Sequence, residues 1–439
     1  MNSSTASREE LLDIIVQQQA LIDQLRERVR ELETGLGKGG PKGMPGLKPG
    51  PARGQKPKSP RKRRPHGFAR RRASEPTERV FHAVECCPRC DIRLMGGSAK
   101  RRREVIEIPI ESVRVIEHVF IERRCPRCRK RLVPKDVLGG VVVGKQRLGV
   151  NLMSLMVTLR EEARVAIGTI RWYLETFHRL RLSEGAIVSA IQRAARLGEG
   201  KSEEVREKIQ ASPVVLADET GWREDGANGY VWTFSTDKER YFVRRGRNKE
   251  VVDEVLGAFS GVLVSDFYAS YNHYPGLHQR CWAHLLRDIH ELKEVHPDDE
   301  GLRAWAEAVG EVYKEAKGFR SPKERKRVQA KAHFEDKLLR LCQPFMEDDG
   351  AAQRRLCLRI IRFLSELFVF VGNPEVPADN NGAERSLRHL VTSRKISGGT
   401  RSPAGTSAKM TLASLFGTWR AQELNPFLQC RQLLTSPQV

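Results

Sequence analysis

Apolar and polar positions change their spacing several times along this chain. In residues 8–33 the apolar side chains recur at multiples of seven positions in two sets: Ile15, Ile22 and Val29 form one, and Leu11, Leu25 and Leu32 the other, with Gln18 as the one polar break. β-Branched residues in one set and Leu in the other are typical of a parallel two-stranded coiled coil. A single amphipathic helix docked on its own domain is the alternative. We predict a coiled-coil dimerisation helix over residues 1–34.

Residues 141–208 follow a helical period. One helix face carries Leu152, Leu155, Met156 and Leu159, a second helix carries Ile167, Ile170 and Leu174, and a third carries Ile187 and Ile191. Ser183 is a suitable N-cap for the third helix. Short helices meeting near residues 180–185 indicate a DNA-binding helix-turn-helix, with plain helical packing as the alternative.

Short apolar runs replace the helical pattern after residue 209. Residues 214–216 lead into Asp218, residues 229–235 and 240–244 follow as strands, 249–259 as a helix, and 261–265 as a strand ending before Asp266. Three strands, a helix and a fourth strand is the order of a ribonuclease H-like core, in which the first and fourth strands are neighbours. We therefore expect an α/β fold with this core over residues 209–405, and Asp218 beside Asp266.

Two nearly identical cysteine motifs precede these segments, Cys87-Pro-Arg-Cys90 and Cys125-Pro-Arg-Cys128. Each can present two thiolates to one tetrahedral Zn²⁺. Between them, alternating apolar residues predict strands: Ile106, Ile108, Ile110, Val113, Val115, Val119 and Ile121. We predict a zinc ribbon over residues 76–140 with one structural Zn²⁺, and Cys86 as a possible substitute ligand. Cys281, Cys342, Cys357 and Cys430 are expected to be small core residues or surface thiols.

The net charge of the chain indicates which class of partner it binds. Seventy-seven Lys and Arg against 55 Asp and Glu give a net charge of +22, which favours a polyanion. Residues 35–75 form a basic Gly/Pro-rich linker, densest at Arg61, Lys62, Arg63 and Arg64; it either tracks DNA phosphates or is a solvated spacer. No apolar run reaches the roughly 18 residues of a spanning helix, and the first ten residues lack a signal-peptide pattern. We expect a soluble cytoplasmic protein that binds nucleic acid.

The acids suggest a chemistry. Two carboxylates on adjacent strands repel each other unless a cation lies between them, and Mg²⁺ prefers oxygen ligands. Glu384, in the first turn of a predicted helix, can supply a third carboxylate. Its alternative is a capping box with Asn381, or an ion pair with Arg388. For each Asp alone, the alternative is a simple strand or turn end.

Several motifs then resemble those of the "insertion sequence sixty-six" transposases. They are residues 217–223 (Ala-Asp-Glu-Thr-Gly-Trp-Arg), 265–271 (Ser-Asp-Phe-Tyr-Ala-Ser-Tyr), 281–284 (Cys-Trp-Ala-His), 381–388 (Asn-Gly-Ala-Glu-Arg-Ser-Leu-Arg) and 395–401 (Lys-Ile-Ser-Gly-Gly-Thr-Arg). The resemblance covers nearly the whole chain and implies a bacterial DDE transposase whose acidic triad is Asp218, Asp266 and Glu384. A helical insertion at about 289–377 then interrupts the core, and a helical tail follows over residues 406–439.

The expected activity is cleavage of the element's ends and their joining to target DNA. The three acids hold two Mg²⁺ or Mn²⁺ ions about 4 Å apart. Expected partners are double-stranded DNA near the nucleoid, a second copy in a homodimer or higher oligomer, and accessory proteins of the same element, with no membrane. Expected DNA contacts, besides the linker, are Arg385, Arg388, Arg394, Lys395 and Arg401. His284 and Arg287 either contact DNA or pack at the core edge.

Two other functions stay open at this point. A ribonuclease H-like nuclease such as a resolvase would cut DNA without joining strands. A non-catalytic DNA-binding regulator would use the zinc ribbon and the basic linker, and replacing any one of the three acids would leave it intact.

Overall fold

The protein is described here from a computed structural model. The structure describes residues 80–96, 98, 113–134 and 138–436, which divide between two units, Met1–Glu107 and Ile108–Val439. The predicted coiled coil and the whole basic linker, including Arg61, Lys62, Arg63 and Arg64, lie outside the described residues. So do Ile106, Ile108 and Ile110.

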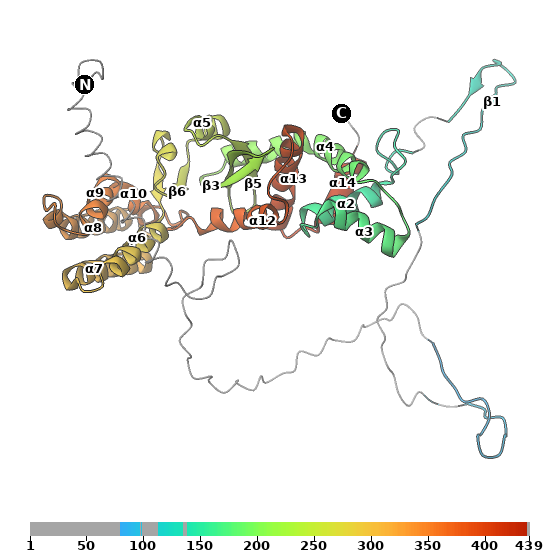
Figure 1. The fold of residues 1–439 in the computed structure, drawn as a ribbon, viewed down its shortest axis with the longest axis horizontal. Helices are drawn as coiled ribbons and strands as arrows, with labels where there is room; N and C mark the ends of the chain where they lie inside the picture. The colour runs from blue at the N-terminus through green and yellow to red at the C-terminus, as the bar shows by residue number, and fades with distance from the viewer. Residues whose placement is uncertain (1–79, 97, 99–112, 135–137, 437–439) are drawn as a thin grey trace, which may run out of the picture. The chain divides into compact units, whose positions relative to one another are not determined.

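The larger unit is built on a mixed five-stranded sheet (Figure 1). Its strands are β3 (Val214–Glu224), β4 (Ala227–Ser235), β5 (Arg240–Arg245), β6 (Val262–Ser265) and β7 (His278–Arg280), in the order β5-β4-β3-β6-β7. Neighbours among β3, β4 and β5 are antiparallel, whereas β6 pairs parallel with both β3 and β7. The α/β class and the predicted pairing of the first and fourth strands are confirmed.

One detail of the first strand differs from the prediction. We expected the strand to end at Asp218, but β3 continues to Glu224 because residues 216–224 form a long antiparallel ladder with β4. The parallel pairing with β6 does stop earlier, at Leu216 opposite Val264. Asp218 therefore lies inside a strand, two residues past the end of its parallel ladder.

The sheet is covered by helices on both faces. On one face, Val215 and Ala217 of β3 pack with α4 (Glu184–Gln210) and α5 (Glu250–Leu256). On the other, Trp222 packs under α12 (Asn381–Ser397) and α13 (Pro403–Ala421). The alternation of β3 side chains thus sends even-numbered residues toward α12 and odd-numbered ones toward α5.

A helical group lies between β7 and α12 in sequence. It comprises α6 (Trp282–Val295), α7 (Glu300–Gly318), α8 (Glu324–Cys342), α9 (Arg354–Arg362), α10 (Leu364–Leu367) and α11 (Val369–Gly372). These helices share a core of their own, in which Trp282 stacks on Tyr313 at 4.8 Å between ring centroids. Cys342 and Cys357 are buried in it, and Cys281 and Cys430 are buried elsewhere, so the core interpretation of these four cysteines is confirmed.

A second helical group combines helices from the beginning and the end of the larger unit. α2 (Val150–Glu161), α3 (Ile167–His178) and α4 pack with α13 and α14 (Pro426–Thr435) in one core. The Ser183 cap is confirmed, since its Oγ accepts a hydrogen bond from the Ala186 amide at 3.1 Å. DNA reading by the α3–α4 turn stays a prediction. No helix among the described residues is long and apolar enough to cross a bilayer.

The segment around the second cysteine motif carries little regular structure. Its ladder joins β1 (Arg123–Arg124) to β2 (Arg131–Leu132). The strand predicted over residues 113–121 is wrong, because these described residues form no ladder and their apolar side chains are exposed, Val115 by 90%. Alternating apolar residues form a strand only where a surface buries one face.

Candidate active site

The strand register brings the two aspartates close together. Leu216 is paired with Val264, and Asp218 and Asp266 each lie two residues beyond that pair. Because side chains alternate along a strand, Asp218 lies on the face that carries Leu216. The charge of Asp266 acts on both Asp218 and Glu219. Asp266 directly follows β6, and its Oδ1 accepts the Tyr268 amide at 2.9 Å.

Glu384 approaches the same face from helix α12. The helix starts against β3, where a Cβ on Gly382 would come within 2.7 Å of Leu216 Cδ2, so glycine permits the close packing. The buried Asn380 side chain donates to the Ala217 carbonyl at 2.7 Å, one residue before Asp218. Glu384 follows in the first turn of the helix, close enough for its charge to act on Asp218.

Electrostatics confirm that the three acids interact. The pKa of Asp218 is raised from 3.8 to about 8, first by burial, then by the negative charges of Glu219, Asp266 and Glu384. Such crowding of carboxylates disfavours their ionised forms unless a cation compensates. All the crowded donors are hard oxygens, which suits Mg²⁺ or Mn²⁺.

Glu384 itself is not used as a helix cap. α12 is capped at Asn380 without a side-chain hydrogen bond, so the predicted capping-box alternative with Asn381 is wrong. Glu384 Oε1 is buried without a hydrogen-bond partner, 3.7 Å from His284 Nε2 and 3.9 Å from Arg287 Nη2. A buried carboxylate oxygen without a hydrogen bond costs free energy. This fits a group whose oxygen binds a ligand.

The acids are near one another without converging on one point. Among the residues that the structure describes, no three His, Cys, Asp or Glu side chains are arranged as ligands of one metal ion. Glu384 lies toward two residues of α6, His284 and Arg287, neither of which sequence patterns had paired with it. The carboxylate oxygens of Asp218, Asp266 and Glu384 are chemically suited to bind a divalent cation. Glu384 lies toward α6 because it is close to His284 and Arg287.

Glu219 is a fourth acid at the site, on the opposite face of β3. Its carboxylate accepts hydrogen bonds from Tyr271 Oη at 2.8 Å and Arg247 Nη2 at 2.9 Å, and its side chain is 4% exposed. Arg247 is itself stacked over the Tyr268 ring at 4.0 Å. Glu219 is therefore a buried, hydrogen-bonded residue beside the three acids. Its position next to Asp218 in the sequence did not predict this role.

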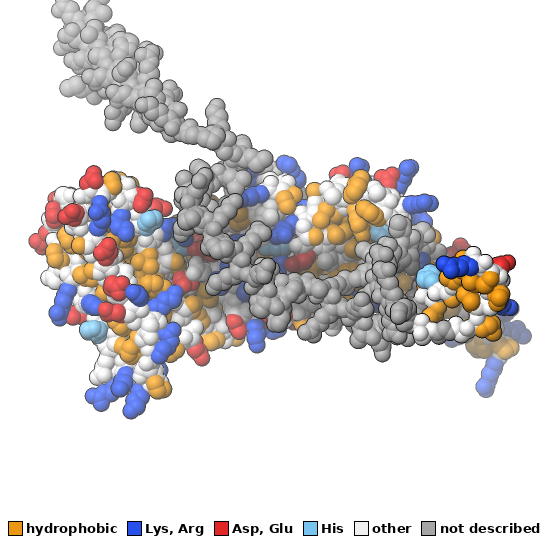
Figure 2. All heavy atoms as spheres, turned by 90° about the horizontal axis from the view of Figure 1, so that it is seen from below, with side chains coloured by type: hydrophobic (Ala, Val, Ile, Leu, Met, Phe, Trp, Pro, Cys, Tyr) orange, Lys and Arg blue, Asp and Glu red, His pale blue; other side chains and the backbone are white. Residues whose placement is uncertain are grey.

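The basic residues expected to contact DNA divide into two groups. Arg385, Arg388, Lys395 and Arg401 are exposed. Arg394 instead donates to Thr220 Oγ1 at 3.1 Å and to the Gly221 carbonyl, which ties the end of α12 to β3. On the face shown in Figure 2, Lys and Arg are mixed with Asp and Glu over the described part, so the positive excess there forms no single patch.

The two cysteine motifs adopt the same turn. The Cys87 amide donates to Ile92 O, and the Asp91 amide to Cys87 O; likewise the Cys125 amide donates to Lys130 O, and the Arg129 amide to Cys125 O, each at 2.9 Å. Hydrogen bonds from the following backbone amides, Arg89 first for Cys87 and Cys128 first for Cys125, lower the pKa of both thiols. Each turn thus favours a thiolate, but the turns belong to different units, and the shared zinc site stays a prediction.

Comparison with known proteins identifies the class. Residues 145–408, more than half of the chain, match the family model "Transposase IS66 family", so the protein is a transposase by family. The chain belongs to the IS66 family. It is also similar to the uncharacterized protein y4jO of Sinorhizobium fredii (strain NBRC 101917 / NGR234), 29% identical over 158 residues, 36% of this chain and 47% of that protein. The match thus spans about half the length of that relative.

Proposed function

We propose that this protein cleaves the ends of its insertion element and joins them to target DNA, using Asp218, Asp266 and Glu384 as its acidic triad. The observation that carries this proposal is the pairing of β3 with β6, with Asp218 and Asp266 each two residues beyond the same pair, and the effect of the charges of Asp266 and Glu384 on Asp218. Membership of the IS66 family supplies the class of reaction.

The sheet supports a ribonuclease H-like core. Three antiparallel strands followed by a helix and two strands parallel to the first give the order β5-β4-β3-β6-β7. Helices α6 to α11 then separate β7 from α12, as a helical insertion at about 289–377 requires. In this chain the third acid therefore follows the second by more than a hundred residues.

In this proposal, Asp218, Asp266 and Glu384 hold two Mg²⁺ or Mn²⁺ ions. The ions supply charge stabilisation for the attacking and leaving oxygens of phosphoryl transfer. The chain's own contribution is to desolvate Asp218, to fix α12 through Asn380, and to place the side chains of His284 and Arg287 beside Glu384. No covalent protein–DNA intermediate is needed, so no Ser or Tyr nucleophile is assigned.

The remaining roles in the proposal concern binding. Cys87, Cys90, Cys125 and Cys128 hold one structural Zn²⁺, and the exposed Arg385, Arg388, Lys395 and Arg401, with Arg394, contact DNA. The chain acts as a homodimer or higher oligomer, so that two DNA ends can meet.

The direct test is an assay with labelled element-end DNA and Mg²⁺. Wild-type protein should cut the end and join it to target DNA, and Asp218→Ala should do neither while still binding the end. Asp253→Ala, an exposed acid on α5, is the control and should retain both steps. Cutting without joining would favour a nuclease or resolvase. Binding with no cutting by wild-type protein would favour a non-catalytic regulator.

A further inference from the structure

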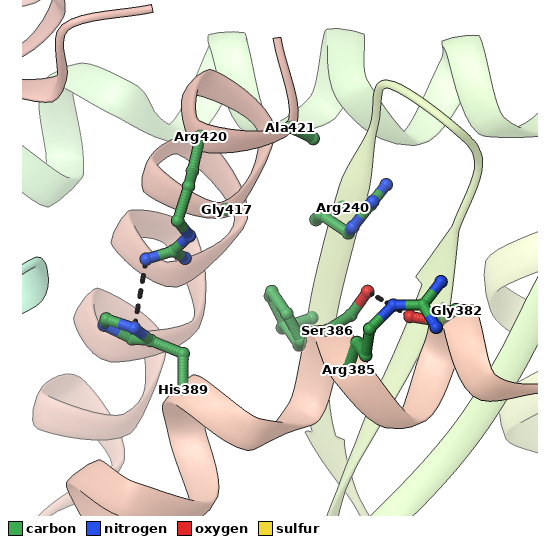
Figure 3. A pocket seen from close by; sticks show the side chains of 9 residues that line it. Arg240, Gly382, Arg385, Ser386, His389, Gly417, Arg420 and Ala421 are labelled. Atoms are coloured by element: carbon green, nitrogen blue, oxygen red, sulfur yellow. Dashed lines mark hydrogen bonds between the residues drawn. The ribbon is translucent and has the colours of Figure 1, made fainter. Parts of the chain in front are cut away.

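A basic pocket lies beside α12, the helix that carries Glu384. Its wall comes from three elements: Arg385, Ser386 and His389 on α12, Arg240 and Phe242 on β5, and Arg420 near the end of α13. Figure 3 shows the three arginines and His389 around one open space. Gly417 keeps α13 close to β5 here, since a Cβ on it would come within 3.1 Å of Arg240 Cβ.

The pocket has room for a small group. Its volume of about 180 Å³ is roughly ten times what one water molecule needs. It is smaller than the pockets of about 300–1,000 Å³ that enclose drug-sized ligands. A tetrahedral anion suits this size better than a nucleobase or a whole nucleotide.

Two of the arginines are held in place by hydrogen bonds. Arg420 Nη1 donates to Glu162 Oε2 at 2.9 Å and to His389 Nδ1 at 3.0 Å. Arg240 Nη1 donates to the Glu239 carbonyl at 2.7 Å and to the Thr236 carbonyl. Since a guanidinium has five N–H donors, each arginine keeps donors for a ligand. Arg385 is exposed and makes no side-chain hydrogen bond to another described residue.

The charges around the pocket are balanced by nearby acids: Glu162 pairs with Arg420, and Asp237 and Glu239 lie near Arg240. Burial is the main cause that lowers the pKa of Arg240. Asp237 and Glu239 oppose this shift, and the positive charges of Arg385 and Arg420 add to it. His389 adds no charge, because burial lowers its pKa to about 4. Like charges gathered around one opening are stabilised by an anion that bridges them.

We propose that this pocket binds a backbone phosphate of the DNA on which the acids act. Arg385 directly follows Glu384 in α12, so both side chains extend from the start of that helix. His389 and Arg420 also bond to Glu161 and Glu162 at the end of α2, which connects the pocket to the helical group α2–α4. The inference rests on the proposed transposase function and assigns to it a DNA-positioning site separate from the metal-binding acids.

The test measures DNA binding in EDTA, where no strand is cut. Affinity for a double-stranded oligonucleotide is recorded at several salt concentrations by fluorescence anisotropy. Arg385→Gln should weaken binding about tenfold and reduce the magnitude of the salt slope by about one. Arg385→Lys should restore the slope but only part of the affinity, because lysine lacks the planar fork. Arg325→Gln removes the same charge from an exposed site on α8 and should change neither quantity.

A second arm separates DNA from free anions. Wild type and Arg385→Gln are melted with and without inorganic phosphate. If phosphate stabilises wild type alone while Arg385→Gln leaves DNA binding unchanged, the pocket takes a free anion and the DNA assignment is overturned. Equal DNA affinity and equal salt slope in wild type and Arg385→Gln, with no stabilisation by phosphate, would overturn the proposal that this pocket binds an anion. Neither result touches the proposed catalysis, which fails only if Asp218→Ala still cuts and joins DNA.

Discussion

The side-chain amide of Asn380 donates a hydrogen bond to the carbonyl of Ala217, 2.7 Å away across 163 residues of sequence. The Asn380 backbone amide also donates to Cys281 Sγ at 3.1 Å. One fully buried residue therefore joins the start of α12, the middle of β3 and the start of α6. These are the elements that carry Glu384, Asp218 and His284.

Asn380→Ala should lower stability and activity together. Loss of the hydrogen bond leaves the buried Ala217 carbonyl without a donor, which costs about 1–3 kcal/mol. The free energy of unfolding from a denaturant titration measures this cost. Asn381→Ala, one residue later and only half-buried, should change it by less than about 0.5 kcal/mol. Equal losses in the two variants would contradict the assigned role of Asn380.

Stability without metal should fall as pH rises from about 4 to about 8. The folded protein keeps Asp218 protonated up to a pKa of about 8, whereas the unfolded chain releases the proton near pH 4, so higher pH favours unfolding. Asp218→Asn should remove this loss and melt a few degrees higher than wild type at pH 8 in EDTA. Thermal melting across this pH range measures the effect.

The matched control for that series is Asp253→Asn on the exposed face of α5. It should keep the wild-type pH dependence. Mg²⁺ should restore stability at pH 8 in wild type and in this control, but not in Asp218→Asn, because a ligand stabilises only the state that binds it. A pH profile unchanged by Asp218→Asn would show that the carboxyl is not the buried, crowded group described above.

One Zn²⁺ per chain should copurify with the protein. Cys125→Ser should remove it, because a structural site needs all four thiolates. Cys86→Ser should retain it, since Cys86 lies next to the first turn without being part of its C-x-x-C pair. Metal analysis by mass spectrometry decides the matter, and zinc retained in Cys125→Ser would exclude the predicted ligand set.

Deleting residues 1–34 should shift the mass in solution toward that of a monomer. The reason is the heptad pattern, whose two apolar sets form a seam only with a second helix. Light scattering coupled to size exclusion measures the mass. An unchanged mass would mean that another surface joins the copies and that the helix docks on its own chain.

Sequence patterns predicted those parts of the fold whose side chains are apolar and whose contacts are local in the sequence. The apolar runs ending before Asp218 and Asp266 were enough to predict β3, β6 and their pairing. Strand β7 was missed because His278, Gln279 and Arg280 are polar, and they are buried only through distant partners. Arg280 Nε donates to Glu366 at 2.6 Å, and Gln279 Nε2 to the Leu367 carbonyl at 3.1 Å. The proximity of His284 and Arg287 to Glu384 was missed for the same reason, since it depends on how α6 packs near α12.

The central claim is that three acids from separate elements act as one site, and Glu384 is its most separate member. Glu384→Gln keeps the shape of the side chain and removes the charge that a divalent ion needs. Cleavage and joining of labelled element ends should both fall by several powers of ten in Mg²⁺, on the order of other losses of essential catalytic groups, while end binding in EDTA stays at the wild-type level. Cleavage within tenfold of wild type would contradict the account and leave Glu384 as a residue that only holds α12 near α6.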